Sequence, residues 1–166
     1  MSKFTWRNGE APNNMPIKQV YGILFSLDGR ILLIAEKLID RKKYCLPGGH
    51  PEDTDKTIED TLRREVLEEV NISVKNPIIV GYQEVDEEDG SCLYAQVRMA
   101  AVIDEVCEKT PDIANGKTYD RLLVSPSKAI DLLNWGEVGY LQIMSAVKIA
   151  ETQFGIKISL DKQEYI

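Results

Sequence analysis

Three glutamates lie close together near the middle of the chain, in the run Arg64-Glu65-Val66-Leu67-Glu68-Glu69. On an α-helix of about 3.6 residues per turn, Glu65, Glu68 and Glu69 fall at about 0°, 300° and 40°, within roughly a third of the circumference. Like charges at this spacing repel one another. Carboxylate oxygens are the ligands that Mg²⁺ and Mn²⁺ prefer, so the cluster suggests a divalent metal site. A solvated acidic helix face is the alternative that the helix alone leaves open.

An amphipathic helix is predicted to carry these glutamates, from about Thr57 to Val70. Its apolar residues recur every four positions and drift slowly round the helix: Ile58, Leu62, Val66 and Val70. This stripe spans about 20° to 140° on the same scale, so the carboxylates border the buried face. Asn71 follows where the helix ends, and Asn tolerates the left-handed conformation of that position.

A glycine turn precedes the helix. Tyr44-Cys45-Leu46 reads as a short strand that ends at Pro47, and Gly48-Gly49 permits a sharp turn in which the backbone approaches a ligand closely. A polar, acidic loop then leads to the helix. The turn and the helix are therefore expected to face one site.

The segment from Gly49 to Ile72 resembles the signature of the Nudix hydrolases. That signature is Gly, five residues, Glu, seven residues, Arg-Glu, an aliphatic, any residue, Glu-Glu, any residue, Gly and an aliphatic. The matching positions are Gly49, Arg64, Glu65, Val66, Glu68, Glu69 and Ile72. Two departures occur. The spacing from Gly49 to Arg64 is one residue longer, so Asp55 or Lys56 stands for the loop glutamate, with Asp55 the easier accommodation. Asn71 replaces the final glycine.

The resemblance implies an α/β fold, namely an α/β/α sandwich with a mixed β-sheet flanked by helices. It also implies Mg²⁺- or Mn²⁺-dependent hydrolysis of a pyrophosphate bond in a small nucleotide-type substrate. The implied metal ligands are Glu65, Glu68, Glu69 and the backbone carbonyl of Gly49. Glu65 or Glu69 would also serve as the base, with Asp120 and Glu105 as weaker candidates from later loops, and Arg64 would brace the loop. A Nudix-fold domain that senses nucleotides without turnover is the alternative, and a homodimer is possible because dimers are frequent in the family.

Weaker candidates for substrate binding are Arg41, His50, Glu52 and Tyr119. Arg41 precedes the short strand and would steer phosphates, although a solvated loop explains it equally well. His50 is the only histidine and fits a solvated loop residue better than a ligand contact. Four aromatic residues are possible stacking partners for a base, although each is more often core or rim: Tyr21, Tyr82, Tyr119 and Trp135.

Strands outnumber helices in the rest of the chain. β-rich runs at Ile17–Ser26 and Ile31–Lys37 join at Asp28-Gly29, a pair typical of a two-residue hairpin turn with both φ angles positive. Further strands are expected at 78–82, 92–103 and 119–124. Ser125-Pro126 begins a helix with an N-cap and a first-position proline, and a last helix follows at about 137–154. Residues 1–16 look like an irregular arm, and 1–166 is taken as one domain.

The composition narrows the classes of partner. Acids outnumber bases 27 to 20, a net charge of −7, which argues against binding of long nucleic acid. The three cysteines are odd in number, lack CxxC spacing and read as reduced thiols of an intracellular protein. The N-terminus lacks a signal-peptide core and no run approaches the roughly 20 apolar residues of a membrane helix. We therefore expect a cytoplasmic protein without a membrane partner.

Overall fold

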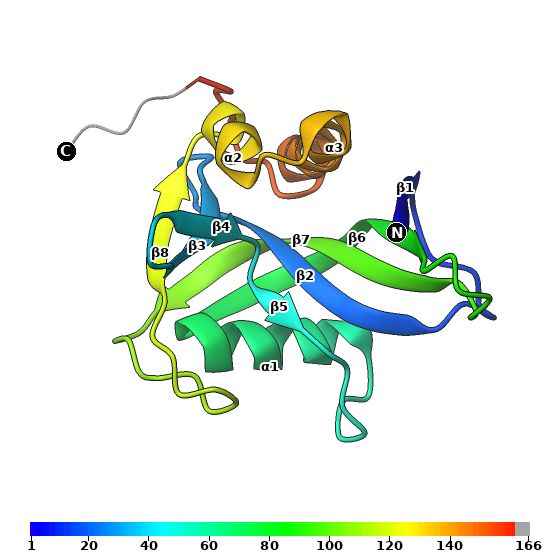
Figure 1. The fold of residues 1–166 in the computed structure, drawn as a ribbon. Coiled ribbons are helices and arrows are strands. Elements are labelled where there is room, and N and C mark those ends of the chain that lie inside the picture. Colours follow the sequence, from blue (N-terminus) through cyan, green and yellow to red (C-terminus); the bar gives the residue numbers. More distant parts are fainter. Residues whose placement is uncertain (162–166) are drawn as a thin grey trace.

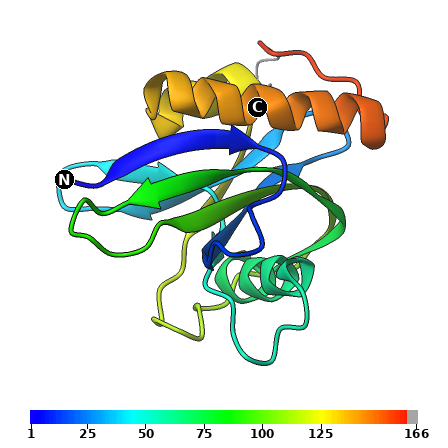
Figure 2. The same ribbon diagram turned by 90° about the vertical axis from the view of Figure 1, so that its right-hand side faces the viewer.

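The computed structural model of the protein describes residues 1–161. A mixed sheet of eight strands lies between helix α1 (Ile58–Val70) on one face and helices α2 (Pro126–Leu133) and α3 (Gly136–Gln153) on the other (Figure 1). The view at right angles shows the same three layers, with α1 and α3 on opposite sides of the strands (Figure 2). This arrangement confirms the α/β/α sandwich that the sequence predicts.

The sheet contains one parallel pair, between β2 and β7, and is otherwise antiparallel. Its order is β1-β6-β7-β2-β3-β4, while β5 pairs with β2 and β8 pairs with β3. The strands are β1 Lys3–Asn8, β2 Ile17–Phe25, β3 Ile31–Lys37, β4 Lys42–Cys45, β5 Gly48–Gly49, β6 Ile72–Asp86, β7 Tyr94–Val106 and β8 Asp120–Val124.

The prediction of an irregular arm over residues 1–16 is wrong for β1. This strand pairs with β6 along its whole length, from Lys3 opposite Asp86 to Asn8 opposite Gly81. It lies at the edge of the sheet and its residues are only exposed or half-buried. Phe4 and Trp6 alternate with polar residues, which is a strand pattern, but the run is short and is followed by the Gly, Pro and Asn residues that suggest an irregular arm. The backbone ladder to β6 forms the strand.

The Asp28-Gly29 hairpin forms, but without the predicted two-residue turn. Gly29 has φ 85°, whereas Asp28 does not adopt a positive φ. The Ser26 amide donates to the Arg30 carbonyl (2.9 Å) and the Gly29 amide to the Ser26 carbonyl (3.0 Å). Strand pairing begins at Phe25 and Ile31. The loop is thus longer than predicted, with only one left-handed residue near its end.

Strand β6 is also longer than the predicted 78–82. It runs to Asp86 and forms a long hairpin with β7, with its register shifted between Lys75 and Ile78. Pro77 lies within this shift, and a proline is tolerated there because no regular ladder bond is required of it. The proline and the polar residues before it hide the strand from sequence patterns.

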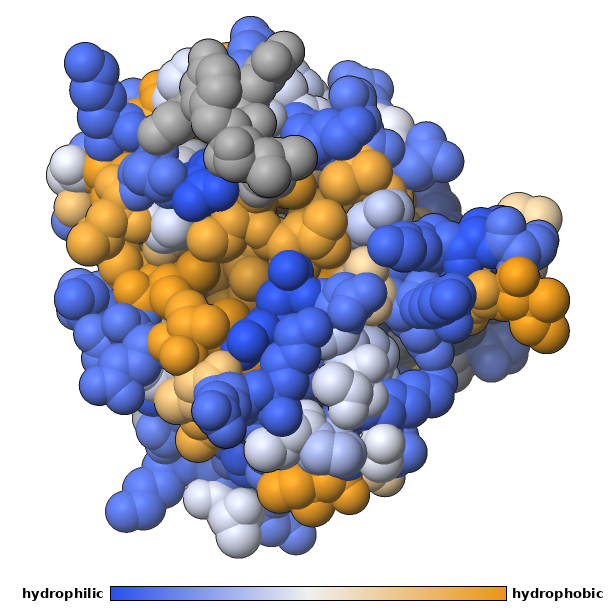
Figure 3. Space-filling view, turned by 90° about the vertical axis from the view of Figure 1, so that its left-hand side faces the viewer, coloured by the Kyte–Doolittle hydropathy of each residue, from blue (hydrophilic) through white to orange (hydrophobic). Residues whose placement is uncertain are grey.

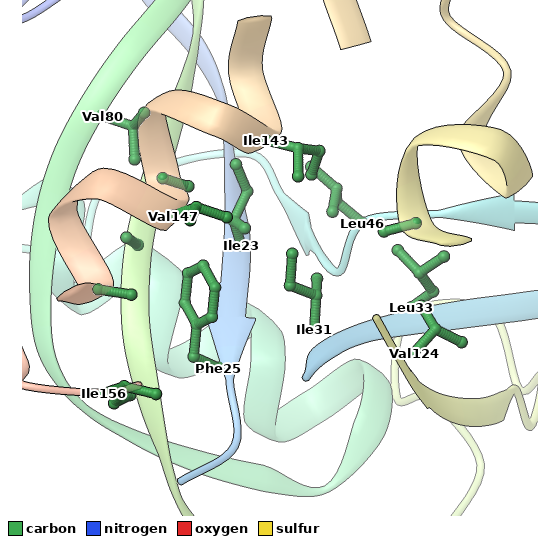
Figure 4. Packing of buried hydrophobic residues seen from close by; sticks show 14 of the residues in the cluster. Ile23, Phe25, Ile31, Leu33, Leu46, Val80, Val124, Ile143, Val147 and Ile156 are labelled. Atoms are coloured by element: carbon green, nitrogen blue, oxygen red, sulfur yellow. The ribbon is translucent and has the colours of Figure 1, made fainter. Parts of the chain in front are cut away.

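Two apolar clusters hold the layers together, one on each face of the sheet. Alternate residues of β2 supply both, since Ile23 and Phe25 face α3 while Leu24 faces α1. Figure 4 shows Ile143 and Val147 of α3 lying over this first cluster. The second cluster contains Leu62, Val66 and Val70 of α1, all buried. Both the sheet and the glutamate helix are therefore rigidly anchored.

Apolar surface gathers on the β8 side of the molecule (Figure 3). A groove of about 420 Å³ at β7 and β8 is lined partly by Ile103, Leu122 and Leu123. Among residues 1–161, no helix is both long and apolar enough to cross a membrane.

Candidate active site

Helix α1 begins and ends where the sequence predicts. The hydroxyl of Thr57 accepts from the Asp60 amide and the Asp60 carboxylate accepts from the Thr57 amide, both at 3.2 Å, which forms a capping box. Asn71 ends the helix with φ 54° and ψ 45°, in the left-handed region. The two caps and the buried stripe set which face Glu65, Glu68 and Glu69 occupy.

The glycine turn packs directly against that face. Gly48 and Gly49 form β5, which pairs with Tyr21 and Val20 of β2 and lies beside α1. A Cβ atom on Gly49 would lie 2.4 Å from the carboxyl group of Glu65, so a side chain at this position would have to displace that carboxyl group. The Gly48 amide donates to Glu69 Oε2 at 2.9 Å. The turn and two of the three glutamates thus meet, as expected.

Arg64 links the acidic loop to the helix. Its Nε and Nη2 donate to Asp55 Oδ1 (3.0 Å) and Oδ2 (2.9 Å), a bidentate pair, and Nη2 also donates to the His50 carbonyl (2.8 Å). The Arg64 guanidinium holds the pKa of Asp55 well below its usual range. Asp55 Oδ2 also accepts from the Glu52 amide and the Thr61 hydroxyl, both at 2.9 Å. The sequence left open whether Asp55 or Lys56 stands for the loop glutamate of the motif. The contacts with Arg64 favour Asp55.

The remaining guanidinium nitrogen of Arg64 faces the glutamates. Nη1 donates to Glu65 Oε1 at 2.9 Å and to Glu68 Oε2 at 3.3 Å, and lies 3.5 Å from Glu52 Oε1. This one cation offsets part of the repulsion among the three carboxylates.

Glu69 and Glu65 are partly desolvated carboxylates. Burial raises the pKa of Glu69 to about 7, the Gly48 amide opposes this, and the nearby carboxylates of Asp112 and Glu65 raise it further. Burial also raises the pKa of Glu65, while the hydrogen bond from Arg64 lowers it. A cation beside these groups would stabilise their charged forms.

The donors fit a divalent metal in chemistry, since carboxylate and carbonyl oxygens are the hard ligands that Mg²⁺ and Mn²⁺ prefer. In their present positions, no three His, Cys, Asp or Glu side chains of the described chain are grouped to hold a metal ion. Arg64 donates to Glu65 and Glu68, while Glu69 accepts from the Gly48 amide.

Asp112 was not found from the sequence. It lies in the loop between β7 and β8, is only 8% exposed and is electrostatically coupled to Glu69. Its carboxylate accepts from the Ala114 amide (2.8 Å) and Asn115 Nδ2 (3.2 Å). An aspartate in a polar loop carries no local signal of this position, because only the tertiary fold returns the loop to α1.

Asn71 tethers the same loop. Its Oδ1 accepts from the Thr110 amide at 2.8 Å, and its Nδ2 donates to the Thr110 hydroxyl at 2.7 Å. The residue that replaces the final glycine of the motif therefore makes contacts that a glycine lacks.

The weaker sequence candidates divide into two groups. Glu52 contacts Arg64, and the hydroxyl of Tyr119 accepts from Asn115 Nδ2 (2.9 Å) on the Asp112 loop. Burial raises the pKa of Tyr119, and Glu69 adds to this. The side chain of His50 is exposed, and its carbonyl is what Arg64 binds. Arg41 lies in the turn between β3 and β4, with no hydrogen bond or ion pair to the motif in the described chain.

A cavity of about 570 Å³ opens beside the glycine turn. Cys45 and Leu46, which lead into Pro47 and Gly48, form part of its wall. Tyr21 and Trp135, two of the aromatic residues considered from the sequence, also line it, whereas Tyr82 is buried in the cluster under α1.

Comparison with known proteins adds a family. The model of the NUDIX domain matches residues 15–139. None of the curated proteins compared with the chain matches it. Among solved structures, a Bacillus subtilis pyrophosphohydrolase is similar with 19% identity and a TM-score of 0.66, covering 94% of each chain.

Two further solved structures share this fold. A mutator MutT protein from Bacillus halodurans is 20% identical with a TM-score of 0.56, covering 76% of this chain and 80% of its own. A NUDIX hydrolase from Nitrosomonas europaea is 18% identical with a TM-score of 0.57, covering 91% and 97%.

Proposed function

The chain belongs to the NUDIX family, and from this premise we propose that it hydrolyses a pyrophosphate bond in a small nucleotide, with Mg²⁺ or Mn²⁺ as cofactor. The substrate would be a nucleoside di- or triphosphate, or a nucleoside diphosphate linked to another moiety. The observation that carries the proposal is the contact of two partly desolvated glutamates, Glu65 and Glu69, with the Gly48-Gly49 backbone.

Glu65, Glu68, Glu69 and the Gly49 carbonyl would hold the metal. When bound, the metal would offset phosphate charge and lower the pKa of an attacking water. Arg64 would keep the loop from His50 to Asp55 in place through its bidentate bond to Asp55. Glu65 or Glu69 would accept the proton of the water.

The remaining parts of the proposal concern the substrate and the chain as a whole. Tyr119 and Glu52 lie at the site and would contact the nucleotide, while His50 and Arg41 would act from exposed loops. The shared sheet and its two apolar clusters support one domain over residues 1–166.

The experiment is a panel of nucleoside triphosphates, diphosphates and nucleotide sugars, assayed for phosphate or pyrophosphate release with Mg²⁺ or Mn²⁺. We expect turnover of at least one member, reduced by about 100-fold or more in Glu69→Gln. Glu59→Gln is the matched control, because Glu59 is a glutamate of the same helix in its first turn, outside the cluster. Turnover that is equal in all three proteins would overturn the metal-site assignment.

One observation favours the second candidate, a domain that senses nucleotides without turnover. Arg64 already holds Glu65 and Glu68, which competes with a metal for those carboxylates. Binding of a nucleotide in the panel without any product would support this function and exclude the first.

A further inference from the structure

Arg98 of β7 is a buried cation whose partners are all neutral. It is 4% exposed and lines the 570 Å³ cavity beside the glycine turn. Its Nε donates to Gln142 Oε1 (2.9 Å), its Nη2 to Gln83 Oε1 (3.1 Å) and its Nη1 to the Gln96 carbonyl (3.3 Å). Within residues 1–161 it makes no ion pair with a carboxylate. Burying a charged guanidinium away from water costs free energy unless other groups stabilise its charge.

Aromatic rings supply part of that compensation. The guanidinium carbon of Arg98 lies 4.8 Å from the centre of the Tyr21 ring and 5.6 Å from that of Trp135, both within cation–π range. Burial lowers the pKa of Arg98 to about 10, so the side chain still carries its proton near neutral pH. The charge is thus partly offset before any ligand binds.

The hydrogen-bonding capacity of Arg98 is not exhausted. A guanidinium has five N–H donors and no acceptor, and the three hydrogen bonds that Arg98 makes within residues 1–161 leave two donors for a ligand. The Gln83 oxygen already accepts from both Arg98 and Gln142, which leaves its amide nitrogen as a further donor. The Gln96 amide nitrogen donates to Gln19, which leaves its oxygen as an acceptor. The cavity therefore presents donors from Arg98 and Gln83 beside an acceptor from Gln96.

The walls of the cavity suit a flat, apolar face. Besides Tyr21 and Trp135, the lining includes Phe4, Tyr44, Leu46 and Val138. The volume lies within the range of small-molecule sites, about 300–1,000 Å³. A hydrated phosphate would gain little from such walls, whereas a nucleobase gains from stacking and burial.

The cavity is also in the right place for the base of a substrate cleaved at the glycine turn. Tyr21 stands opposite Gly48 in the β2–β5 pair, and the Gly48 amide donates to Glu69 Oε2 at 2.9 Å, so the cavity and the glutamates meet at the same turn. A nucleotide with its base between these walls would direct its phosphates toward Gly48 and Gly49.

We propose that this cavity selects the base of the substrate, and that Arg98 makes it specific for a 6-oxopurine such as guanine or hypoxanthine. The O6 and N7 atoms of these bases accept hydrogen bonds, and an N1–H donor meets the Gln96 oxygen. Adenine has an amino group in place of O6. This group would face Arg98, and because both groups are hydrogen-bond donors, they cannot bond to each other. The inference rests on the proposed function for the position of the phosphates, but recognition of the base does not require hydrolysis.

The test measures binding of GMP, IMP and AMP by isothermal titration calorimetry, since none of the three contains a pyrophosphate bond. We expect GMP and IMP to bind about 5- to 150-fold more tightly than AMP, the range for one well-formed bidentate contact to a base. IMP lacks the 2-amino group of GMP, so similar binding of the two assigns the preference to O6 and N1–H. Equal affinity for AMP would overturn the inference.

Two variants assign the preference to Arg98. Arg98→Met keeps a long side chain without donors, and we expect the ratio of GMP to AMP affinity to fall to about one. Lys43→Met is the matched control, because it removes a cation from the exposed rim of the same cavity and should leave the ratio unchanged. If Arg98→Met fails to fold, Arg98→Lys retains the charge without the planar fork, and the ratio should still fall.

The remaining outcomes separate this inference from the proposed function. Equal weakening of GMP, AMP and inorganic phosphate in Arg98→Met would show that the cavity takes a phosphate, which overturns base selection. Preference for GMP without turnover on the panel would leave base selection intact and remove the hydrolase. Hydrolysis of all four nucleoside triphosphates at equal rates, with no preference among the monophosphates, would support the hydrolase and overturn base selection.

Discussion

Asp55 is a single residue that joins a lengthened loop to helix α1. The loop between Gly49 and Arg64 has one extra residue, yet Asp55 reaches Arg64 with both carboxylate oxygens. Because the pKa of Asp55 is lowered in the folded protein, the bond stabilises the fold above pH about 4 and is lost as the pH falls further.

We predict that Asp55→Asn lowers the free energy of unfolding by about 1–3 kcal/mol near neutral pH, the usual cost of losing a charged hydrogen bond. Lys56→Gln should leave it unchanged, because Lys56 makes none of these contacts. Urea unfolding at pH 7 and pH 3 measures both. The difference in unfolding free energy between the wild type and Asp55→Asn should be smaller at pH 3 than at pH 7. A larger loss of stability in Lys56→Gln than in Asp55→Asn would show that the assignment of the loop position to Asp55 is wrong.

Glu69 should have the opposite pH dependence in metal-free protein. Its pKa rises from the ordinary 4.5 to about 7 on folding. Between these two values the folded protein holds a proton that the unfolded chain has released, so stability falls as the pH rises, by at most about 1.4 kcal/mol per pH unit. Unfolding in EDTA at pH 5, 6 and 7 should show this slope in the wild type and a flatter one in Glu69→Gln. Equal slopes would refute the raised pKa.

At the scale of elements, the sequence predicts what local chemistry encodes. Helix α1 was predictable because its cap at Thr57, its apolar stripe and Asn71 all lie within one segment. Strand β1 was missed although Phe4 and Trp6 alternate with polar residues, because the run is short and its order comes from pairing with β6. The loop carrying Asp112 was not predictable either, since its place depends on Asn71 and Thr110, which are 39 residues apart.

Asn71 should anchor the loop that carries Asp112 to the end of α1. Asn71→Gly keeps the left-handed helix end but removes both bonds to Thr110, so we expect faster hydrogen exchange in residues 107–119 and a loss of about 1–2 kcal/mol in unfolding free energy. Asn134→Gly is the matched control, because Asn134 ends α2 with the same φ of 54°. Equal exchange in the two variants would contradict a tether.

At the scale of the whole molecule, the candidate site combines segments that no local pattern joins. The glycine turn and the glutamates were predictable from one stretch of sequence. Arg98, by contrast, lies in β7, and Asp112 lies in the loop after it. Arg98 in particular reads as an ordinary polar residue of a strand, and only its burial beside Tyr21 and Trp135 sets it apart. A homodimer remains a prediction from the family, which light scattering would test.

Metal binding should stabilise the entire fold, because a ligand that binds only the folded state shifts unfolding by mass action. At a Mn²⁺ concentration of about 100 times the dissociation constant, the free energy of unfolding increases by about 2.7 kcal/mol. In a chain of this size, this increase raises the melting temperature by roughly 5–11 °C. The net charge of −7 makes a nonspecific contribution from screening possible, so NaCl at equal ionic strength is the reference. Glu59→Gln should retain the Mn²⁺ shift and Glu69→Gln should lose most of it. A shift of the same size in NaCl, or in Glu69→Gln, would mean that the cation acts on the charge of the whole molecule and that the three glutamates form no metal site.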